Sequence, residues 1–165
     1  MLAQDVASAF DSAGDYAEDG NTGRWMNIIQ FQWEHLLLLE PQDSQRDEID
    51  NSSLKELRTY GLSSPAYTAV HKGRIVACAG ILGLGDEVGV FWCFLAKAAA
   101  PFMLRFSRMA PDMIGMCQQK SVVALAMGDF SPSTRWLRML GFTVDGSRVP
   151  ITARGKQFDW YKLGD

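Results

Sequence analysis

The sequence has little cysteine and histidine, two residue types that often bind metals or take part in nucleophilic catalysis. Among 165 residues there are 3 cysteines and 2 histidines. Cys78, Cys93 and Cys117 lie in apolar runs without C-x-x-C spacing, which favours buried free thiols over a metal site or a disulfide. His35 lies in a leucine-rich segment and His71 in an expected turn, so neither is placed for a nucleophile dyad or a zinc site. We therefore expect no bound metal and no serine-hydrolase chemistry.

Long apolar runs and a leader pattern are also missing. The most apolar stretch, VGVFWCFLAKAAAPFMLRF, is interrupted by Lys97, and a membrane-spanning helix needs about 18 uninterrupted apolar residues. The N-terminal segment has neither the basic start nor the apolar core of a secretory signal. These absences predict a cytoplasmic protein that does not associate with membranes.

Charge is distributed unevenly along the chain. The net charge is -3, yet residues 1–96 carry 6 basic and 14 acidic side chains, whereas residues 97–165 carry 10 basic and 5 acidic ones. A net positive C-terminal part is typical of a site for an anion such as a nucleotide diphosphate, and solvated helix faces are the alternative. Nucleic acid is not expected as a partner, because the basic residues are dispersed and no binding motif accompanies them.

The chain has the size of one ordinary domain. Its first 20 residues contain five acids and no base, and the breaker cluster NTGR follows them. We expect an acidic N-terminal extension over residues 1–24, with a helix over residues 2–10 as one option. A single domain is expected over residues 25–165.

The expected domain begins with a strand and two helices. Residues 26–32 alternate as a strand does, and residues 33–40 indicate a short helix that ends before a proline. Ser53 and Glu56 have the spacing of a capping box. Gly61 is expected to end the helix that they start.

Three consecutive antiparallel strands are expected next. Residues 66–70 and 75–84 flank the turn HKGR, in which Gly73 allows the positive φ of a tight reversal. Residues 88–96 follow a glycine-containing turn and are apolar on both faces. This pattern is typical of a central strand.

The second half of the domain predicts a helical crossover between parallel strands. Pro101 suits the first turn of a helix whose apolar stripe ends at Cys117, and Pro111 is expected to kink or split this helix. Residues 121–127 are expected to form another fully buried strand. The crossover predicts that this strand runs parallel to residues 88–96.

A last helix and two strands complete the expected sheet. Ser131 and Pro132 provide a cap and a first-turn proline, and Gly141 closes the helix. Strands are expected over residues 142–146 and 157–163. The predicted order is therefore β-α-α-β-β-β-α-β-α-β-β.

This order resembles the fold of the GNAT family of acyl-CoA-dependent N-acyltransferases across residues 26–163. The most specific local match is STRWLRMLGF, in which a helix ends in Leu140 and is followed by Gly141 and Phe142 as in that family. Within the family, the chain is most similar to GNAT-type proteins of short-tailed bacteriophages. The resemblance implies an α/β (α+β) fold: a mixed, mostly antiparallel sheet of six to seven strands flanked by helices, with one parallel pair that splays apart.

The resemblance implies that acetyl-CoA or another acyl-CoA binds between the parallel strands as a co-substrate. Backbone amides at the start of the next helix would hold its pyrophosphate. Family members place a glycine-containing loop there, whereas this chain has KAAAPF without a glycine, so that Lys97 would neutralise a phosphate. The donor-binding residues implied in this way are Trp92, Phe94, Leu95, Ala96, Lys97, Ala99, Ala100 and Phe102.

The implied chemistry departs from the family at one position. Many members have a tyrosine four residues before the glycine of the Gly-Phe pair, which protonates the leaving thiolate, and this chain has Leu137 there. Ser131 is the candidate proton donor, with helix capping as the alternative. Glu87 is the candidate general base, with a solvated turn residue as the alternative.

Two functions follow from the resemblance. The first is transfer of an acetyl or similar group from acyl-CoA to an amine of a small molecule or a protein, including a host protein. The second is a catalytically inactive GNAT-fold protein that binds a partner or belongs to a virion. A homodimer is an open alternative to a monomer, and the expected location is the bacterial host cytoplasm, or the virion for a phage structural protein.

Overall fold

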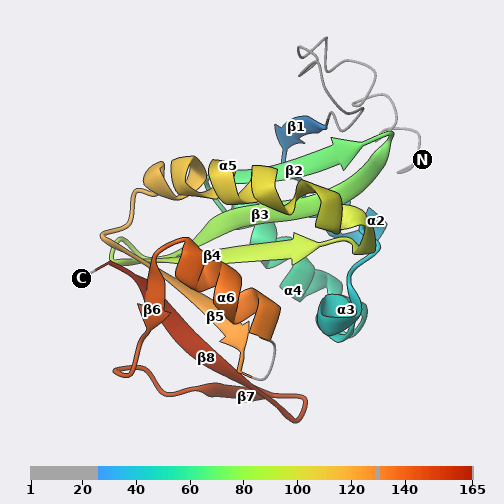
Figure 1. Cartoon of the computed structure of the whole chain (residues 1–165). Coiled ribbons are helices and arrows are strands. Elements are labelled where there is room, and N and C mark those ends of the chain that lie inside the picture. The colour runs from blue at the N-terminus through green and yellow to red at the C-terminus, as the bar shows by residue number, and fades with distance from the viewer. Residues whose placement is uncertain (1–25, 129–130, 165) are drawn as a thin grey trace.

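The computed structural model describes residues 26–128 and 131–164, and it contains one mixed sheet with helices on both faces (Figure 1). In this part of the chain the strand order is β1-β2-β3-β4-β5-β8-β6, and β7 pairs with β8. The strands are β1 Asn27–Gln30, β2 Ala66–His71, β3 Arg74–Leu84, β4 Val88–Leu95, β5 Ser121–Met127, β6 Phe142–Val144, β7 Ile151–Ala153 and β8 Lys156–Leu163. The predicted extension over residues 1–24 lies outside the described residues.

Among the described strand pairs, β4 and β5 are parallel and the others are antiparallel. This confirms the predicted fold class, a mostly antiparallel sheet with one parallel pair. The crossover from β4 to β5 is a helix, as its sequence predicted, because strands that run in the same direction need a long connection.

The helices form two layers that pack on opposite faces of the sheet (Figure 1). One layer contains the three short N-terminal helices and the other contains the helices of the C-terminal half. The elements are α2 His35–Leu38, α3 Asp43–Asp50, α4 Leu54–Thr59, the 3-10 turn η1 Tyr60–Leu62, the 3-10 turn η2 Lys97–Phe102, α5 Met103–Gly115 and α6 Ser131–Met139.

Strand β4 supplies both cores because its side chains alternate between the faces. Trp92 and Phe94 pack in the cluster that includes Leu36 of α2. Phe91 packs in the opposite cluster with Leu137 of α6. The strand is therefore buried on both sides, as its continuous apolar sequence predicted.

Several local predictions are confirmed. The Ser53 hydroxyl accepts from the Glu56 N–H at 3.2 Å, and the Glu56 carboxylate accepts from the Ser53 N–H at 2.6 Å, which completes the capping box. Gly73 has φ 72° in the β2–β3 turn, and Gly141 has φ 96° after α6. Both are left-handed conformations that glycine adopts without strain.

Other boundaries differ from the predictions. The helix expected over residues 33–40 contains only His35–Leu38, and α3 was not predicted at all, because Ile49 is its one buried residue. Gly61 does not end α4 as a left-handed cap but lies within η1. Short helices held by few apolar contacts leave little periodicity in a sequence.

Two further differences concern α5 and the C-terminal hairpin. The α-helix begins at Met103 rather than near Ala100, because η2 precedes it, and it continues through Pro111 without splitting. Buried residues on both sides of this proline hold the helix against the sheet, so packing outweighs the lost backbone hydrogen bond. Strand β7 was not predicted, and its three residues are exposed.

His35 is buried against the sheet in the first helical layer. Its Nδ1 atom accepts from the Gln32 N–H at 3.2 Å, so the Thr68 hydroxyl at 2.8 Å also donates to it. Burial lowers the pKa of His35 below its ordinary value of 6.5, and the nearby charge of Glu34 opposes this shift. The imidazole is thus held neutral, with its proton on Nε2.

We predict that His35 makes the fold sensitive to acid. Because the folded-state pKa is lowered, the unfolded chain binds the proton first, and stability falls as the pH drops below about 6.5. The loss is at most about 1.4 kcal/mol for each pH unit below that value. Urea unfolding of wild type and His35→Asn at pH 7.5, 6.5 and 5.5 measures it, and the variant should lose less stability over this range. Equal pH dependence in the two proteins would contradict the prediction.

Candidate functional site

The parallel strands β4 and β5 stay together for only part of their length. They pair from Val88 opposite Ser121 to Phe91 opposite Ala124. Beyond this point β4 continues beside β3, while the other edge of β5 pairs with β8 as far as Met127. The two strands therefore separate in the middle of the sheet, as the splayed pair of the sequence analysis requires.

A cleft of about 310 Å³ lies at this opening. Its walls come from the separated ends of β4 and β5, from η2 and the start of α5, from α6, and from the start of α3. Its lining residues include Gln42, Ser44, Gln45, Glu48, Trp92, Cys93, Leu95, Ala96, Lys97, Ala99, Ala100 and Ser133.

A larger cavity of about 570 Å³ lies on the other side of the opening, between α3, α4 and the β7–β8 hairpin. Ser44, Gln45, Glu48, Trp92 and Cys93 line both spaces. The cleft and the cavity therefore meet where the parallel strands separate. The combined space is lined by residues from both helical layers.

The structure brings together six of the eight predicted donor-binding residues. Trp92, Leu95, Ala96, Lys97, Ala99 and Ala100 line the cleft. Phe94 lines the larger cavity instead and packs in the same core cluster as Trp92. Phe102 is buried in the core beneath α5 and lines neither space.

Neither of the two predicted catalytic side chains, those of Glu87 and Ser131, can be placed at the opening. Glu87 lies in the turn before β4, at the closed end of the parallel pair, where its carboxylate pairs with Lys120. As a base it stays a prediction that the geometry does not support. Ser131 begins α6, and its side chain lies outside the described residues. Leu137, at the position of the family's tyrosine, is buried in the core.

Glu48 on α3 is a candidate that the sequence analysis missed. It lines both the cleft and the larger cavity, and its Oε1 accepts from the Tyr60 hydroxyl at 3.3 Å. Burial raises the pKa of Glu48, while the hydrogen bond from Tyr60 and the charge of Arg154 partly oppose the rise. A carboxylate in this state accepts a proton more readily than a solvated one. The sequence of α3 has no periodic apolar pattern, so nothing in the sequence marks Glu48 as a site residue.

Cys93 also lines the opening, but it is not suited to nucleophilic attack. Burial raises the pKa of its thiol to about 12, and the nearby Cys78 adds to the rise. The nucleophilic form of cysteine is the thiolate, so this side chain stays a neutral thiol at physiological pH. A covalent intermediate on Cys93 is therefore disfavoured.

At the opening, the edge of β4 that β5 no longer pairs with is hydrogen-bonded by residues that precede and begin α3. The side-chain amide of Gln45 donates to the Cys93 carbonyl at 2.7 Å and accepts from the Leu95 N–H at 2.8 Å. The Gln42 N–H donates to the Leu95 carbonyl at 2.9 Å. The Lys97 N–H donates to the Glu40 carbonyl at 3.1 Å. Residues 40–45, which we call the edge segment, thus follow the end of β4.

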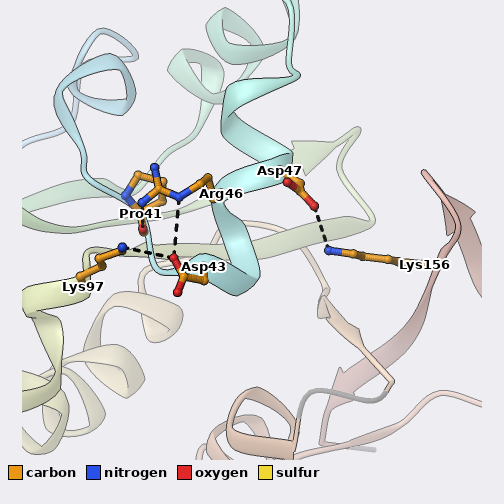
Figure 2. A network of polar contacts seen from close by, with 6 residues as sticks. All are labelled: Pro41, Asp43, Arg46, Asp47, Lys97 and Lys156. Atoms are coloured by element: carbon orange, nitrogen blue, oxygen red, sulfur yellow. Dashed lines mark hydrogen bonds and ion pairs between the residues drawn. The ribbon is translucent and has the colours of Figure 1, made fainter.

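Ion pairs hold α3 across the opening (Figure 2). Asp43 Oδ1 lies 3.2 Å from Lys97 Nζ and 3.7 Å from Arg46 Nε, and Asp47 Oδ2 lies 3.2 Å from Lys156 Nζ on β8. These side chains are largely exposed, and such pairs contribute about 0–1 kcal/mol each. Their main effect is to connect α3 to η2 on one side and to β8 on the other.

The start of the β4–β5 crossover has few donors left for an anion. In η2 the Lys97 N–H is bonded to Glu40, the Ala99 N–H donates to the Ala96 carbonyl at 3.0 Å, and Pro101 has no N–H. The Lys97 side chain, predicted as a phosphate partner, is paired with Asp43. Binding of a phosphate here would require Lys97 to exchange Asp43 for the ligand.

Solved structures of known proteins resemble this fold. A chimera of spermidine N-acetyltransferase SpeG from Vibrio cholerae and hSSAT matches with a TM-score of 0.59 at 10% identity, over 84% of this chain and 94% of that one. The GNAT-family acetyltransferase from Streptococcus pneumoniae matches with 0.54 at 10% identity, over 85% and 100%. Aminoglycoside acetyltransferase AAC(6')-Ib in complex with coenzyme A matches with 0.55 at 13% identity, over 84% and 94%.

The chain therefore has the fold of the GNAT-family acetyltransferases. At these identities the likeness shows the fold alone. No protein-family model matches the sequence, and no curated protein matches it either. Within residues 26–128 and 131–164, no helix is long and apolar enough to cross a membrane, and no cluster of three histidine, cysteine or acidic side chains could hold a metal ion.

Ser44 carries a polar atom that the protein itself leaves unsatisfied. Its hydroxyl is buried beside Gln45 and has no hydrogen-bond partner among the described residues. A buried unpaired hydroxyl costs about 1–3 kcal/mol. The residue lines both the cleft and the cavity, so a polar group bound there would relieve this cost.

We predict that Ser44→Ala stabilises the free protein. The change removes the unpaired hydroxyl and places a better helix former in the first turn of α3. A gain of about 1 kcal/mol would raise the melting temperature by about 2–4 °C. Ser52→Ala is the matched control, because the Ser52 hydroxyl donates to the Glu48 carbonyl and its loss should lower the melting temperature. A Ser44→Ala protein that melts below wild type would show that this hydroxyl has a partner.

Proposed function

We propose that the protein is an acyl-CoA-dependent N-acyltransferase, which moves an acetyl or similar group from a CoA thioester to an amine. The observation that carries the proposal is the separation of β4 from β5, which places the polar edge of β4 inside a cleft open to both faces. The arm of CoA is a narrow chain that contains amides, and a strand edge binds such chains through backbone hydrogen bonds. The fold shared with acetyltransferases supports the same assignment.

The reaction would be a direct displacement in a ternary complex. The amine attacks the thioester carbonyl, a C–N bond forms, the C–S bond breaks, and the sulfur leaves as a thiolate that takes up a proton. The rate acceleration comes chiefly from holding the two reactants together at the opening. We place the acyl donor in the cleft and the amine in the larger cavity, where Glu48 lines the meeting point.

Proton transfer would use residues on both walls. Glu48 accepts the proton that the amine loses, which its raised pKa favours. Ser131 remains the proposed donor to the leaving thiolate, since it begins the same helix as Ser133, which lines the cleft. The acceptor is an amine of a small molecule or protein, and the resemblance to phage proteins adds a host protein to the candidates.

A second function is favoured by a specific observation. The edge of β4 is already bonded to Gln45 and Gln42, and Lys97 is already paired with Asp43. A protein that no longer binds acyl-CoA could keep this arrangement permanently and serve as a GNAT-fold binding or virion-associated protein. Binding of the acyl donor separates the two functions.

We predict that acetyl-CoA stabilises the protein. At about 100 times its dissociation constant a ligand adds roughly 2.7 kcal/mol, which for a domain of this size raises the melting temperature by about 5–11 °C. Lys97→Gln should reduce the shift, because it removes a positive charge from the proposed phosphate end. Lys120→Gln is the matched control, since Lys120 pairs with Glu87 at the closed end of β4. A wild-type melt unchanged by millimolar acetyl-CoA would reject the enzyme in favour of the binding protein.

We predict that Glu48→Gln lowers amine-dependent release of CoA by about 100-fold or more, the usual contribution of a general base. Glu87→Gln should have no effect, because Glu87 lies at the closed end of the strand pair. The wild-type rate should fall as the pH decreases through the pKa of Glu48, which is raised above its ordinary value of 4.5. A thiol assay of released CoA over a panel of amines measures this. The reverse result, with Glu87→Gln inactive and Glu48→Gln active, would restore the base that the sequence suggested.

A further inference from the structure

Gln45 makes an unusual pair of contacts with the edge of β4. One side-chain amide supplies a donor to the Cys93 carbonyl and an acceptor to the Leu95 N–H, at 2.7 and 2.8 Å. This is how a peptide group of a neighbouring strand pairs with a β-edge. The side chain thus takes the place of one amide of an extended chain.

The contacts lie on a part of the β4 edge that pairs with no other strand. Phe91 is the last residue of β4 that pairs with β5, and Cys93 and Leu95 follow it on the same edge. On the other edge the Ala96 N–H donates to the carbonyl of Val76 in β3. Without Gln45, the Cys93 carbonyl and Leu95 N–H would face the cleft as unpaired groups.

We propose that Gln45 is a built-in competitor of the acyl donor: its side-chain amide occupies the edge of β4 that an amide of the donor takes, and the donor binds by displacing it. The inference rests on the proposed function and adds the control of that site. The Gln45 side chain releases its two bonds, turns out of the cleft and leaves a donor amide in its place. The free protein keeps the edge paired until the donor arrives.

The rest of the edge segment can stay in place during this exchange. The Gln42 N–H is bonded to the Leu95 carbonyl through the backbone, and the Asp47–Lys156 pair holds α3 to β8. Only a side chain with freely rotating bonds has to move. Ser44 gives independent support, because its buried unpaired hydroxyl adjoins Gln45 in the same cleft and would gain a partner from a polar ligand.

The test compares dissociation constants for acetyl-CoA, measured by isothermal titration calorimetry. Gln45→Ala removes the competitor, and Gln45→Met removes its hydrogen bonds while keeping its length. Both should bind acetyl-CoA roughly tenfold more tightly than wild type, the change expected when about one net hydrogen bond no longer competes. Gln30→Ala is the matched control, because the partly buried Gln30 amide also donates to a backbone carbonyl, that of Ala66, at 3.2 Å.

Hydrogen exchange at the Leu95 amide gives a readout that does not depend on tighter binding. Without ligand, this amide should be protected in wild type and Gln30→Ala and should exchange faster in both Gln45 variants. Excess acetyl-CoA should restore protection in the variants. Rapid exchange in ligand-free wild type would overturn the inference, because Gln45 would then not occupy the edge.

The outcomes separate the inference from the proposed function. Tighter binding by both Gln45 variants, or binding by these variants alone, supports the two together. Equal affinities in wild type and both variants would leave the acyltransferase standing and overturn Gln45 as competitor. Absence of binding in all four proteins would reject the acyl donor itself, and the inference with it. If Gln45→Ala fails to fold, Gln45→Met alone decides between these results.

Discussion

The site depends on one constraint: every backbone polar group inside a sheet needs a partner, and β5 gives β4 a partner for only four residues. The other edge of β5 is committed to β8 up to Met127, so the second half of the strand follows β8. The opening is therefore a direct result of the pairing pattern. Whatever fills it has to present donors and acceptors to the end of β4.

The edge segment and a bound acyl donor are two solutions to the same requirement. The segment satisfies the edge with Gln45 and the backbone of Gln42, at the cost of one unpaired hydroxyl on Ser44. A donor would satisfy the edge and the hydroxyl together. Under the proposed acyltransferase function the closed arrangement is the resting state of the site, whereas in a GNAT-fold binding protein it would be permanent.

The packing that stabilises the fold and the polar side chains at the opening come from different elements. Trp92 and Phe94 build one core and Phe91 the other, so β4 is held firmly on both faces. The side chains that we propose act at the opening, Gln45 and Glu48, instead lie on short, polar α3, which exposed ion pairs connect to η2 and β8. Glu48 lines the larger cavity beside the opening, and its burial raises its pKa.

Elements with local signals could be predicted from the amino-acid sequence. The capping box at Ser53, the turn at Gly73, the apolar strands and the crossover helix were all predicted from neighbouring residues, and their order led to the fold class. Six of the eight residues that the sequence predicted to bind the donor line one cleft, because they follow one another from β4 into η2.

The residues that face β4 across the cleft follow from long-range contacts and not from local sequence patterns. Gln45 and Glu48 lie on a helix with one buried residue, and their partners Cys93, Leu95 and Tyr60 are between 12 and 50 positions away. Glu87 is close to β4 in sequence but lies at its closed end. Periodicity records which side chains share a face of one element, whereas the position of a short polar helix depends on hydrogen bonds to distant backbone, which leave no pattern in the chain.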